Sequence, residues 1–117
     1  MTPTSNLGIE VRKVKAATVL DLKGRLIMGE AVESFKTNVR EFLAGGGQNL
    51  AVNLAGLSYV DSSGISSMVE VTEMAQKAGT DCKYFAATKR VLQLLRIARL
   101  DTTIIMHADE ASALMNY

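Results

Sequence analysis

Four consecutive residues, Asp61-Ser62-Ser63-Gly64, carry the side chains of this sequence that are best placed to do chemistry. They follow an apolar segment, Leu50-Ala51-Val52-Asn53-Leu54, that predicts a strand, and they precede an amphipathic pattern that predicts a helix. Unpaired amides and the positive end of a helix dipole favour an oxyanion or a phosphate at such a position. We therefore expect a site that added charge can switch.

The same residues have a simpler interpretation as a helix cap. Asp, Ser and Gly are common before helices, so Asp61 or Ser62 could merely satisfy amides of the first turn. Local chemistry alone favours the cap over the switchable site, and only the wider pattern of the chain alters that balance.

Hydrolase chemistry is disfavoured by the residues around the serine. A nucleophile elbow has glycines two positions before and after the serine, whereas Ser62 has Val60 and Gly64 there. A triad also needs a base, and His107 is the only histidine. We expect a protein that is not an enzyme.

Metal and cofactor sites are not indicated either. One Cys and one His cannot close a zinc site, and Asp81, Asp101 and Asp109 show no ligand spacing. The glycines at 45–47 lead into Gln48-Asn49 and not into the Gly-Lys-Ser/Thr ending of a phosphate loop. We therefore expect that the protein binds neither a metal ion nor a cofactor.

Length and composition predict one domain over residues 1–117, with 1–6 as a flexible tail. The chain has 117 residues, of which 48% are hydrophobic, enough for one core. A net charge of +1, with cations such as Lys13, Lys15, Arg40 and Arg90 scattered along the chain, argues against nucleic acid as a partner.

Nothing in the sequence predicts a membrane span or export. Residues 42–60 are uncharged, but glycines, Gln48 and two asparagines interrupt them. The first seven residues lack a basic start followed by a long apolar run, so a cytoplasmic location is expected. The lone Cys82 lies in an apolar segment, as a buried small hydrophobe would.

Periodicity and breaker residues predict an α/β fold with five strands and four helices. The predicted strands are Gly8–Val14, Ala17–Leu22, Asn49–Leu54, Cys82–Ala86 and Thr102–Met106. The predicted helices run from Glu30 to the glycines at 45–47, from Asp61 to Gly79, onward from a cap at Thr88, and from Asp109 to Met115. Strands separated by helices imply a mainly parallel sheet, with an antiparallel hairpin where the first two strands adjoin.

Finer expectations follow from local composition. Gly24 should close the second strand, and a loop should run from Arg25 to Gly29. The apolar third strand should be covered on both faces. The helix after Thr88 should bury most of its surface through five apolar residues: Val91, Leu92, Leu94, Leu95 and Ile97. An edge strand near Ile9 could pair with a second copy to form a homodimer.

From Gly24 to Leu114 the sequence resembles the STAS domain family, the bacterial anti-sigma factor antagonists and the related cytoplasmic domains of sulfate transporters. The resemblance is carried by the run from Ala51 to Ile65, which ends in Asp-Ser-Ser-Gly-Ile. It continues in the third-helix pattern of Thr88, Val91, Leu94, Leu95, Ile97 and Leu100. The family fold is a small sheet of four to five strands, mixed and mostly parallel, with about four helices packed chiefly on one side.

The resemblance implies a phosphoprotein that switches partners in transcription regulation. An anti-sigma factor serine kinase would phosphorylate Ser62, with Ser63 as second candidate, and a serine phosphatase would reverse it. Unphosphorylated protein would bind the anti-sigma factor and release the sigma factor. The residues expected at that partner surface are Asp61, Ser62, Ser63, Gly64, Ile27, Met28 and Tyr59.

Two positions depart from the antagonist pattern and keep an alternative open. Ile27 follows Gly24-Arg25-Leu26 where antagonists usually show an aspartate that helps hold the kinase, and Arg99 stands where a small residue is common. The alternative is a non-switching STAS scaffold or accessory subunit of a transporter or lipid-trafficking complex. Ile27, Met28 and Tyr59 would then form its apolar docking patch.

Overall fold

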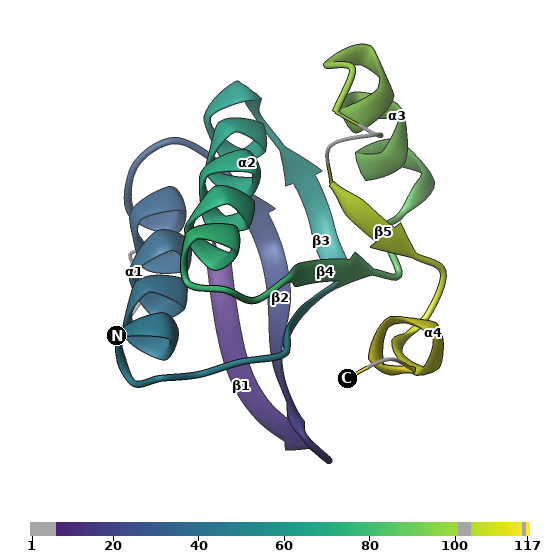
Figure 1. Cartoon of the computed structure of the whole chain (residues 1–117). Coiled ribbons are helices and arrows are strands. Elements are labelled where there is room, and N and C mark those ends of the chain that lie inside the picture. Colours follow the sequence, from purple (N-terminus) through teal and green to yellow (C-terminus); the bar gives the residue numbers. More distant parts are fainter. Residues whose placement is uncertain (1–6, 101–103, 116) are drawn as a thin grey trace.

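The computed structural model describes residues 7–100, 104–115 and 117, and its elements alternate as the sequence predicts (Figure 1). The strands are β1 (Leu7–Val14), β2 (Ala17–Leu26), β3 (Leu50–Val60), β4 (Cys82–Phe85) and β5 (Ile105–His107). The helices are α1 (Glu30–Ala44), α2 (Ser62–Lys77), α3 (Lys89–Ile97) and α4 (Glu110–Leu114). The expected flexible tail, residues 1–6, lies outside the described residues.

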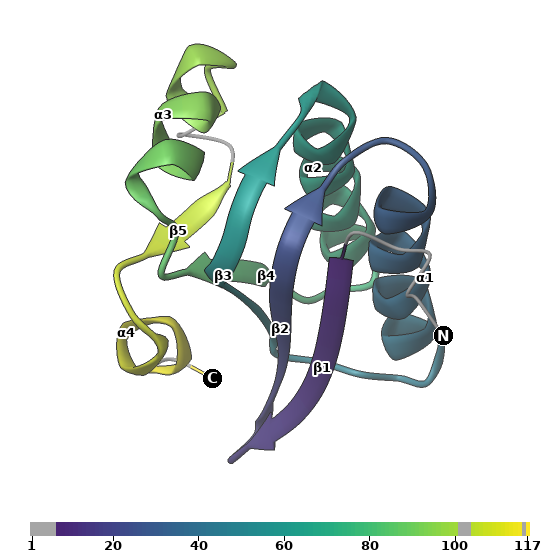
Figure 2. The same ribbon diagram turned by 180° about the vertical axis from the view of Figure 1, so that it is seen from behind.

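The five strands form one sheet in the order β1-β2-β3-β4-β5. β1 pairs antiparallel with β2, and the other three pairings are parallel. Because β2, β3 and β4 are sequential neighbours, right-handed crossovers place α1 and α2 on the same face. Figures 1 and 2 show these two helices side by side against that face. The predicted α/β fold with a mixed, mostly parallel sheet is confirmed.

The main core lies between the sheet and the pair α1 and α2. Phe35 and Val39 of α1 and Met68 of α2 are fully buried against apolar side chains of the inner strands. Those strand residues are Leu20, Leu22, Leu50, Val52, Leu54 and Leu57. Burial on this scale explains why two short amphipathic helices hold their place.

The opposite face of the sheet has a smaller core under α4. Val19, Ala51, Phe85 and Ala113 form this second cluster and are all buried. The first residues of β3 are therefore covered on both faces, as their apolar sequence predicts. Beyond Leu54 the strand carries exposed residues, so the double covering is confined to its start.

The prediction that Gly24 closes the second strand is wrong. β2 continues to Leu26, and Gly24 pairs with Leu7 on one side and with Leu57 on the other. Its φ of 102°, a conformation that favours glycine, accompanies a register shift between Gly24 and Arg25. The glycine therefore marks an irregularity inside the strand, and the loop before α1 is only Ile27–Gly29.

The third strand is also longer than predicted. It runs to Val60, six residues beyond the predicted end at Leu54, and its pairing with β2 has a second register shift between Asp21 and Lys23. A side chain at Gly56 would lie 2.9 Å from the carbonyl oxygen of Leu22, so the two backbones approach closely there. β3 therefore delivers Asp61 directly from a strand into α2.

The third helix buries less than the sequence predicts. Val91 and Leu95 are buried and Leu92 and Leu94 are half-buried, but the side chain of Ile97 is 73% exposed. α3 packs mainly against β3 and lies at one end of the sheet (Figure 1), so only one side of it is covered. Its predicted cap is confirmed, because Thr88 Oγ1 accepts a hydrogen bond from Val91 N at 3.3 Å.

The ends of the chain agree with prediction in outline. β4 ends at Phe85, and the last strand begins at Ile105, later than the predicted Thr102, which lies outside the described residues. Asp109 caps α4 by accepting from Ser112 N at 2.8 Å. β1 is an edge strand as expected, and its pairing with a second copy stays a prediction.

Cys82 is buried at the start of β4, as predicted for a small hydrophobe. Burial raises the pKa of its thiol to about 12, so the thiolate is scarce near neutral pH.

Candidate functional site

Asp61 joins the start of α2 to the loop before α1. Its Oδ1 accepts a hydrogen bond from Gly64 N at 2.8 Å, and its Oδ2 accepts one from Met28 N at 2.9 Å. The first contact is a helix cap, so the capping interpretation is right for Asp61. The second contact fixes the loop between β2 and α1 beside the first turn of α2.

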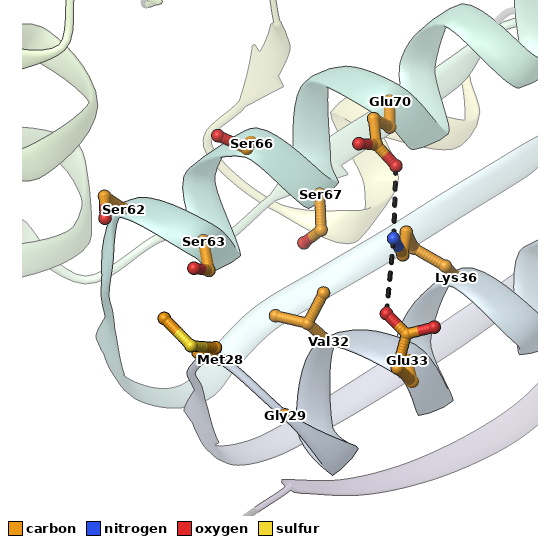
Figure 3. Close-up of a pocket in the computed structure, with 10 residues that line it drawn as sticks. All are labelled: Met28, Gly29, Val32, Glu33, Lys36, Ser62, Ser63, Ser66, Ser67 and Glu70. Atoms are coloured by element: carbon orange, nitrogen blue, oxygen red, sulfur yellow. Dashed lines mark ion pairs between the residues drawn. The ribbon is translucent and has the colours of Figure 1, made fainter.

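The hydroxyl of Ser62 is exposed at the first residue of α2. Within residues 7–100, 104–115 and 117 it makes no hydrogen bond, and the cap of α2 is supplied by Asp61. Ser63 is half-buried, and its hydroxyl points toward Met28 (Figure 3). Ser66 is exposed one turn deeper, whereas Ser67 is buried and donates to the carbonyl oxygen of Gly64 at 2.6 Å. Of these four hydroxyls, that of Ser62 lies at the very mouth of the helix.

Gly64 is buried where α2 crosses the end of β2. A Cβ there would lie 2.2 Å from the carbonyl oxygen of Leu26 and 2.7 Å from Val60 Cγ1. The same oxygen accepts a hydrogen bond from Asp61 N at 3.2 Å. The packing of α2 against Leu26 and Val60 therefore requires glycine at position 64. Its contribution to a partner surface stays a prediction.

A groove of about 370 Å³ lies between α1 and α2, beside these serines (Figure 3). Its lining combines apolar side chains, hydroxyls and charges: Met28, Gly29, Val32, Glu33, Lys36, Ser62, Ser63, Ser66, Ser67 and Glu70. Met28 is 73% exposed, so this groove offers an apolar contact next to the Ser62 hydroxyl.

Charged side chains occupy the other end of the groove. Lys36 Nζ lies 3.3 Å from Glu33 Oε2 and 3.3 Å from Glu70 Oε2, so it ties α1 to α2. These carboxylates, Glu33 first, raise the pKa of Lys36 above its usual value. Two carboxylates against one ammonium leave the groove with a negative excess, to which a phosphate on Ser62 would add.

Groups for other chemistries are not gathered at this groove. No histidine lines it, and His107 lies on β5. The described part of the chain holds no cluster of three or more His, Cys, Asp or Glu residues suited to a metal ion. Among the same residues, no helix combines the length and apolar character needed to cross a bilayer.

The STAS domain family matches residues 8–113 of the chain. This chain belongs to the STAS family. No curated protein sequence matches it significantly, so the family and the solved structures carry the comparison.

Solved structures of anti-sigma factor antagonists share this STAS fold. An antagonist from Mycobacterium paratuberculosis is 15% identical, with a TM-score of 0.81, over 98% of this chain and 97% of that one. The antagonist SpoIIAA, in its unphosphorylated form, is 15% identical, with a TM-score of 0.71, over 93% and 96%. Part of a murine solute carrier 26 anion transporter is 15% identical, with a TM-score of 0.72, over 89% of this chain and 18% of that one. At these identities the likeness shows the STAS fold alone.

The expected partner-binding residues of this STAS domain do not all lie together. Asp61, Ser62 and Ser63 share one end with Met28, which Asp61 holds in place. Ile27 is half-buried and packs against the main core, and it does not line the groove.

Tyr59 belongs to a different neighbourhood from Met28. It pairs with Arg25 in the sheet, and the Arg90 guanidinium of α3 lies 5.3 Å from its ring centroid. The predicted apolar patch of Ile27, Met28 and Tyr59 is thus divided between the core, the groove and α3, and its use in docking stays a prediction.

Sequence reasoning missed the contribution of α1 to the site. Val32, Glu33 and Lys36 line the groove from α1, and Glu70 completes it from α2. The signal that could have found them is the strand order, because sequential parallel strands place α1 and α2 on one face. Glu33 and Lys36 are spaced i,i+3 and so share one side of α1, and Lys36 also reaches Glu70 on the neighbouring helix α2.

Proposed function

We propose that this STAS protein is an anti-sigma factor antagonist in which phosphorylation of Ser62 prevents binding to an anti-sigma factor kinase. In the unphosphorylated state it binds that kinase and releases the sigma factor. A serine phosphatase restores the binding state. The protein acts through binding and not through catalysis.

The observation that carries this proposal is that Asp61 makes the structural hydrogen bonds at the start of α2, while Ser62 beside it is exposed. Asp61 accepts from both Gly64 N and Met28 N, so the fold does not depend on the neighbouring hydroxyl. Ser62 is exposed at the first residue of α2 and open to an approaching nucleotide. Its modification can therefore proceed without unfolding the start of the helix.

Electrostatics supports a change of partner upon phosphorylation. A phosphate adds between one and two negative charges, and the helix N-terminus tolerates it. The adjoining groove already carries Glu33 and Glu70 against Lys36 alone. A partner surface that fits the exposed Met28 and the neutral Ser62 would have to accept a charge that is costly to desolvate.

A structural neighbour supports the same interpretation. SpoIIAA is known in an unphosphorylated and in a phosphorylated form, and both share the fold of this chain. The resemblance to the antagonists implies that the phosphorylated serine directly follows the motif aspartate, and the serine at that position in this chain is Ser62.

Phosphate transfer tests the proposal directly. The full chain is incubated with ATP and a histidine-kinase-type anti-sigma factor from the same genome, and the modified residue is located by mass spectrometry. We expect one phosphate on Ser62 in the wild type and in Ser63→Ala, and none in Ser62→Ala. Because Asp61 supplies the cap, Ser62→Ala should keep the wild-type unfolding free energy to within about 0.5 kcal/mol.

Binding to the same kinase provides the second arm. Ser62→Ala should bind as the wild type does, whereas Ser62→Asp should bind at least about tenfold more weakly. Gln76→Glu, which adds the same charge at an exposed position of α2 away from the groove, is the control and should bind as the wild type does. Phosphate on another residue, or tight binding by Ser62→Asp, would refute the mechanism.

A second function, a non-switching STAS scaffold or accessory subunit, is favoured by one observation. Ile27, where antagonists usually show an aspartate, is half-buried and packs against the main core. This function predicts that Ile27→Asp leaves the protein without phosphate, and that Ser62→Asp binds its partner as the wild type does. If Ile27→Asp instead accelerates transfer to Ser62, the switching function gains and the scaffold loses.

A further inference from the structure

α3 gathers positive charge that the rest of the chain does not share. Among its residues and those just after it, Lys89, Arg90, Arg96 and Arg99 are all exposed. No Asp or Glu occurs between Asp81 and Asp101. The remaining sequence therefore carries a net negative charge, since the chain as a whole has a formal charge of only +1.

Among the residues that the structure describes, Lys89, Arg96 and Arg99 form no ion pair with a carboxylate. The carboxylates of Asp21, Glu110, Glu33 and Glu70 pair instead with Arg12 and Lys36, which are far from α3 in the sequence. Exposed cations without carboxylates leave a positive potential over one surface.

Two of these cations, Lys89 and Arg96, share one stripe of α3 with Leu92 and Gln93. Lys89, Leu92, Gln93 and Arg96 follow one another at helical spacing, and together they line a shallow depression. Next to it lies a more enclosed pocket of about 250 Å³, lined by Leu92, Leu95, Arg96, Ile104 and Met106. Arg96 is the one charged residue of that lining, and the other four residues are apolar.

The pocket is large enough to take a bulky apolar side chain. A closed cavity of about 150 Å³ lined by aliphatic residues can hold a benzene ring. Leu92 and Leu95, with Ile104 and Met106 from the chain that follows, supply a comparable lining here. A flat anionic surface would meet the cations but would leave this recess unused.

We propose that the stripe Lys89, Leu92, Gln93 and Arg96, with the adjoining pocket, is a docking surface for an acidic segment of a partner protein. One large apolar side chain of that segment enters the pocket, and flanking carboxylates pair with Lys89 and Arg96. This surface shares no residue with the groove beside Ser62, so it operates whether or not that serine is phosphorylated.

Nucleic acid fits the same surface less well. The segment from Lys89 to Leu100 contains no Phe, Tyr or Trp on which a base could stack. The recess is lined by aliphatic side chains and methionine, which suit a leucine or phenylalanine of a peptide.

Selection from a random peptide library tests the proposal. A phage-displayed library of about twelve random residues is panned on the immobilised full chain, and enriched peptides are synthesised and titrated by fluorescence anisotropy. We expect enriched sequences in which Asp or Glu flanks Leu, Ile, Met or Phe. The double variant K89E/R96E should weaken their binding at least about tenfold, and Leu92→Ala should weaken it by several-fold.

A matched control separates this surface from net charge. R40E/K77E changes the total charge by the same amount at exposed positions of α1 and α2, and it should leave peptide binding unchanged. Circular dichroism and thermal unfolding establish that each variant is folded. Ser62→Asp should also bind the peptides as the wild type does, so failure of the phosphorylation switch would leave this result intact.

Four outcomes would overturn the proposal. Enriched peptides could lack acidic residues, or both double variants could lose binding equally. No peptide could bind, while vesicles containing phosphatidylserine or a DNA duplex bind the wild type and do not bind K89E/R96E. Finally, sedimentation could show that a second copy of the chain occupies the surface.

Discussion

The helices α2 and α3 each follow a strand of the parallel part of the sheet, β3 and β4 (Figures 1 and 2), and their starts differ in how the fold holds them. Asp61 caps α2 and also binds Met28 N of the preceding loop. Thr88 caps α3 through one longer contact, 3.3 Å to Val91 N. The capping side chain of α2 thus makes two hydrogen bonds, and that of α3 makes one.

The two helices also differ in what they present to a partner. The first turn of α2 shows neutral hydroxyls beside a groove whose charges are mostly acidic. α3 shows cations along a stripe with an apolar recess. The proposed phosphorylation site is thus held by two hydrogen bonds of Asp61, whereas the proposed docking surface lies on a helix whose cap makes one.

Gly64→Ala should cause the largest loss of stability at either helix start. The new Cβ would lie 2.2 Å from the carbonyl oxygen of Leu26, which is backbone and cannot rotate away. We expect the unfolding free energy from urea denaturation to fall by about 3 kcal/mol.

The matched control is Gly45→Ala at the end of α1. Gly45 has a φ of −80°, and its nearest neighbour would be 3.5 Å from the added Cβ. That variant should differ from the wild type by less than about 0.5 kcal/mol. Equal losses at the two glycines would mean that α2 does not depend on close approach to β2.

Asp61→Ala should have the next largest effect, because it removes two hydrogen bonds at once. Loss of the cap to Gly64 N costs about 1 kcal/mol, and loss of the contact to Met28 N costs a similar amount, about 2 kcal/mol in all. Amide exchange measured by NMR should quicken at Met28 as well as at Gly64. Asp61→Asn can keep the acceptor for Gly64 N, so its loss should be roughly half. A change confined to Gly64 would contradict the bridging role.

Most of the fold follows from the sequence because periodicity and breakers act locally. The helices from Glu30 and from Asp61, and their ends at the glycines near 45 and 79, are where the pattern predicts them. The predicted end of the second strand at Gly24 was wrong because a glycine with positive φ can lie at an irregularity inside a strand as well as in a turn. Only the pairing with β1 and β3 distinguishes the two cases.

The candidate site was predictable only in its contiguous part. Asp61 to Gly64 stand together in the sequence, whereas Val32, Lys36 and Glu70 reach the groove through the packing of α1 on α2. The exposure of Ile97 could not be predicted from the sequence either. α3 packs on one side only, so an apolar residue on its other side stays in solvent.

Thr88→Ala measures the weaker of the two helix starts. It removes one contact of 3.3 Å and leaves the rest of α3 packed through Val91 and Leu95, so we expect a loss of about 0.5 kcal/mol. Thr88→Ser keeps the acceptor and should behave as the wild type in thermal unfolding. A loss as large as that of Asp61→Ala would remove the difference between the two starts.

The smallest change in unfolding free energy is expected from lowering the pH. It should come from contacts of β2 and α4 and not from the start of α2 or α3. Arg12 pairs with Asp21 on β2 and with Glu110 on α4, and Asn53 donates to Asp21 at 2.8 Å. The hydrogen bond from Arg12 is the main reason that the pKa of Asp21 is lowered in the folded protein. A carboxyl with a lowered folded pKa stabilises the fold above its unfolded pKa, and that contribution is lost as the pH falls below about 4.

Asp21→Asn should therefore flatten the fall of unfolding free energy between about pH 5 and pH 2, relative to the wild type. Glu73→Gln, on the exposed side of α2, provides the control and should keep the wild-type slope. Because Arg12 links Asp21 to Glu110, amides of α4 should lose protection from exchange before those of the first turns of α2 and α3. If acid instead released the start of α2 first, the bridge made by Asp61 would be weaker than its two hydrogen bonds indicate.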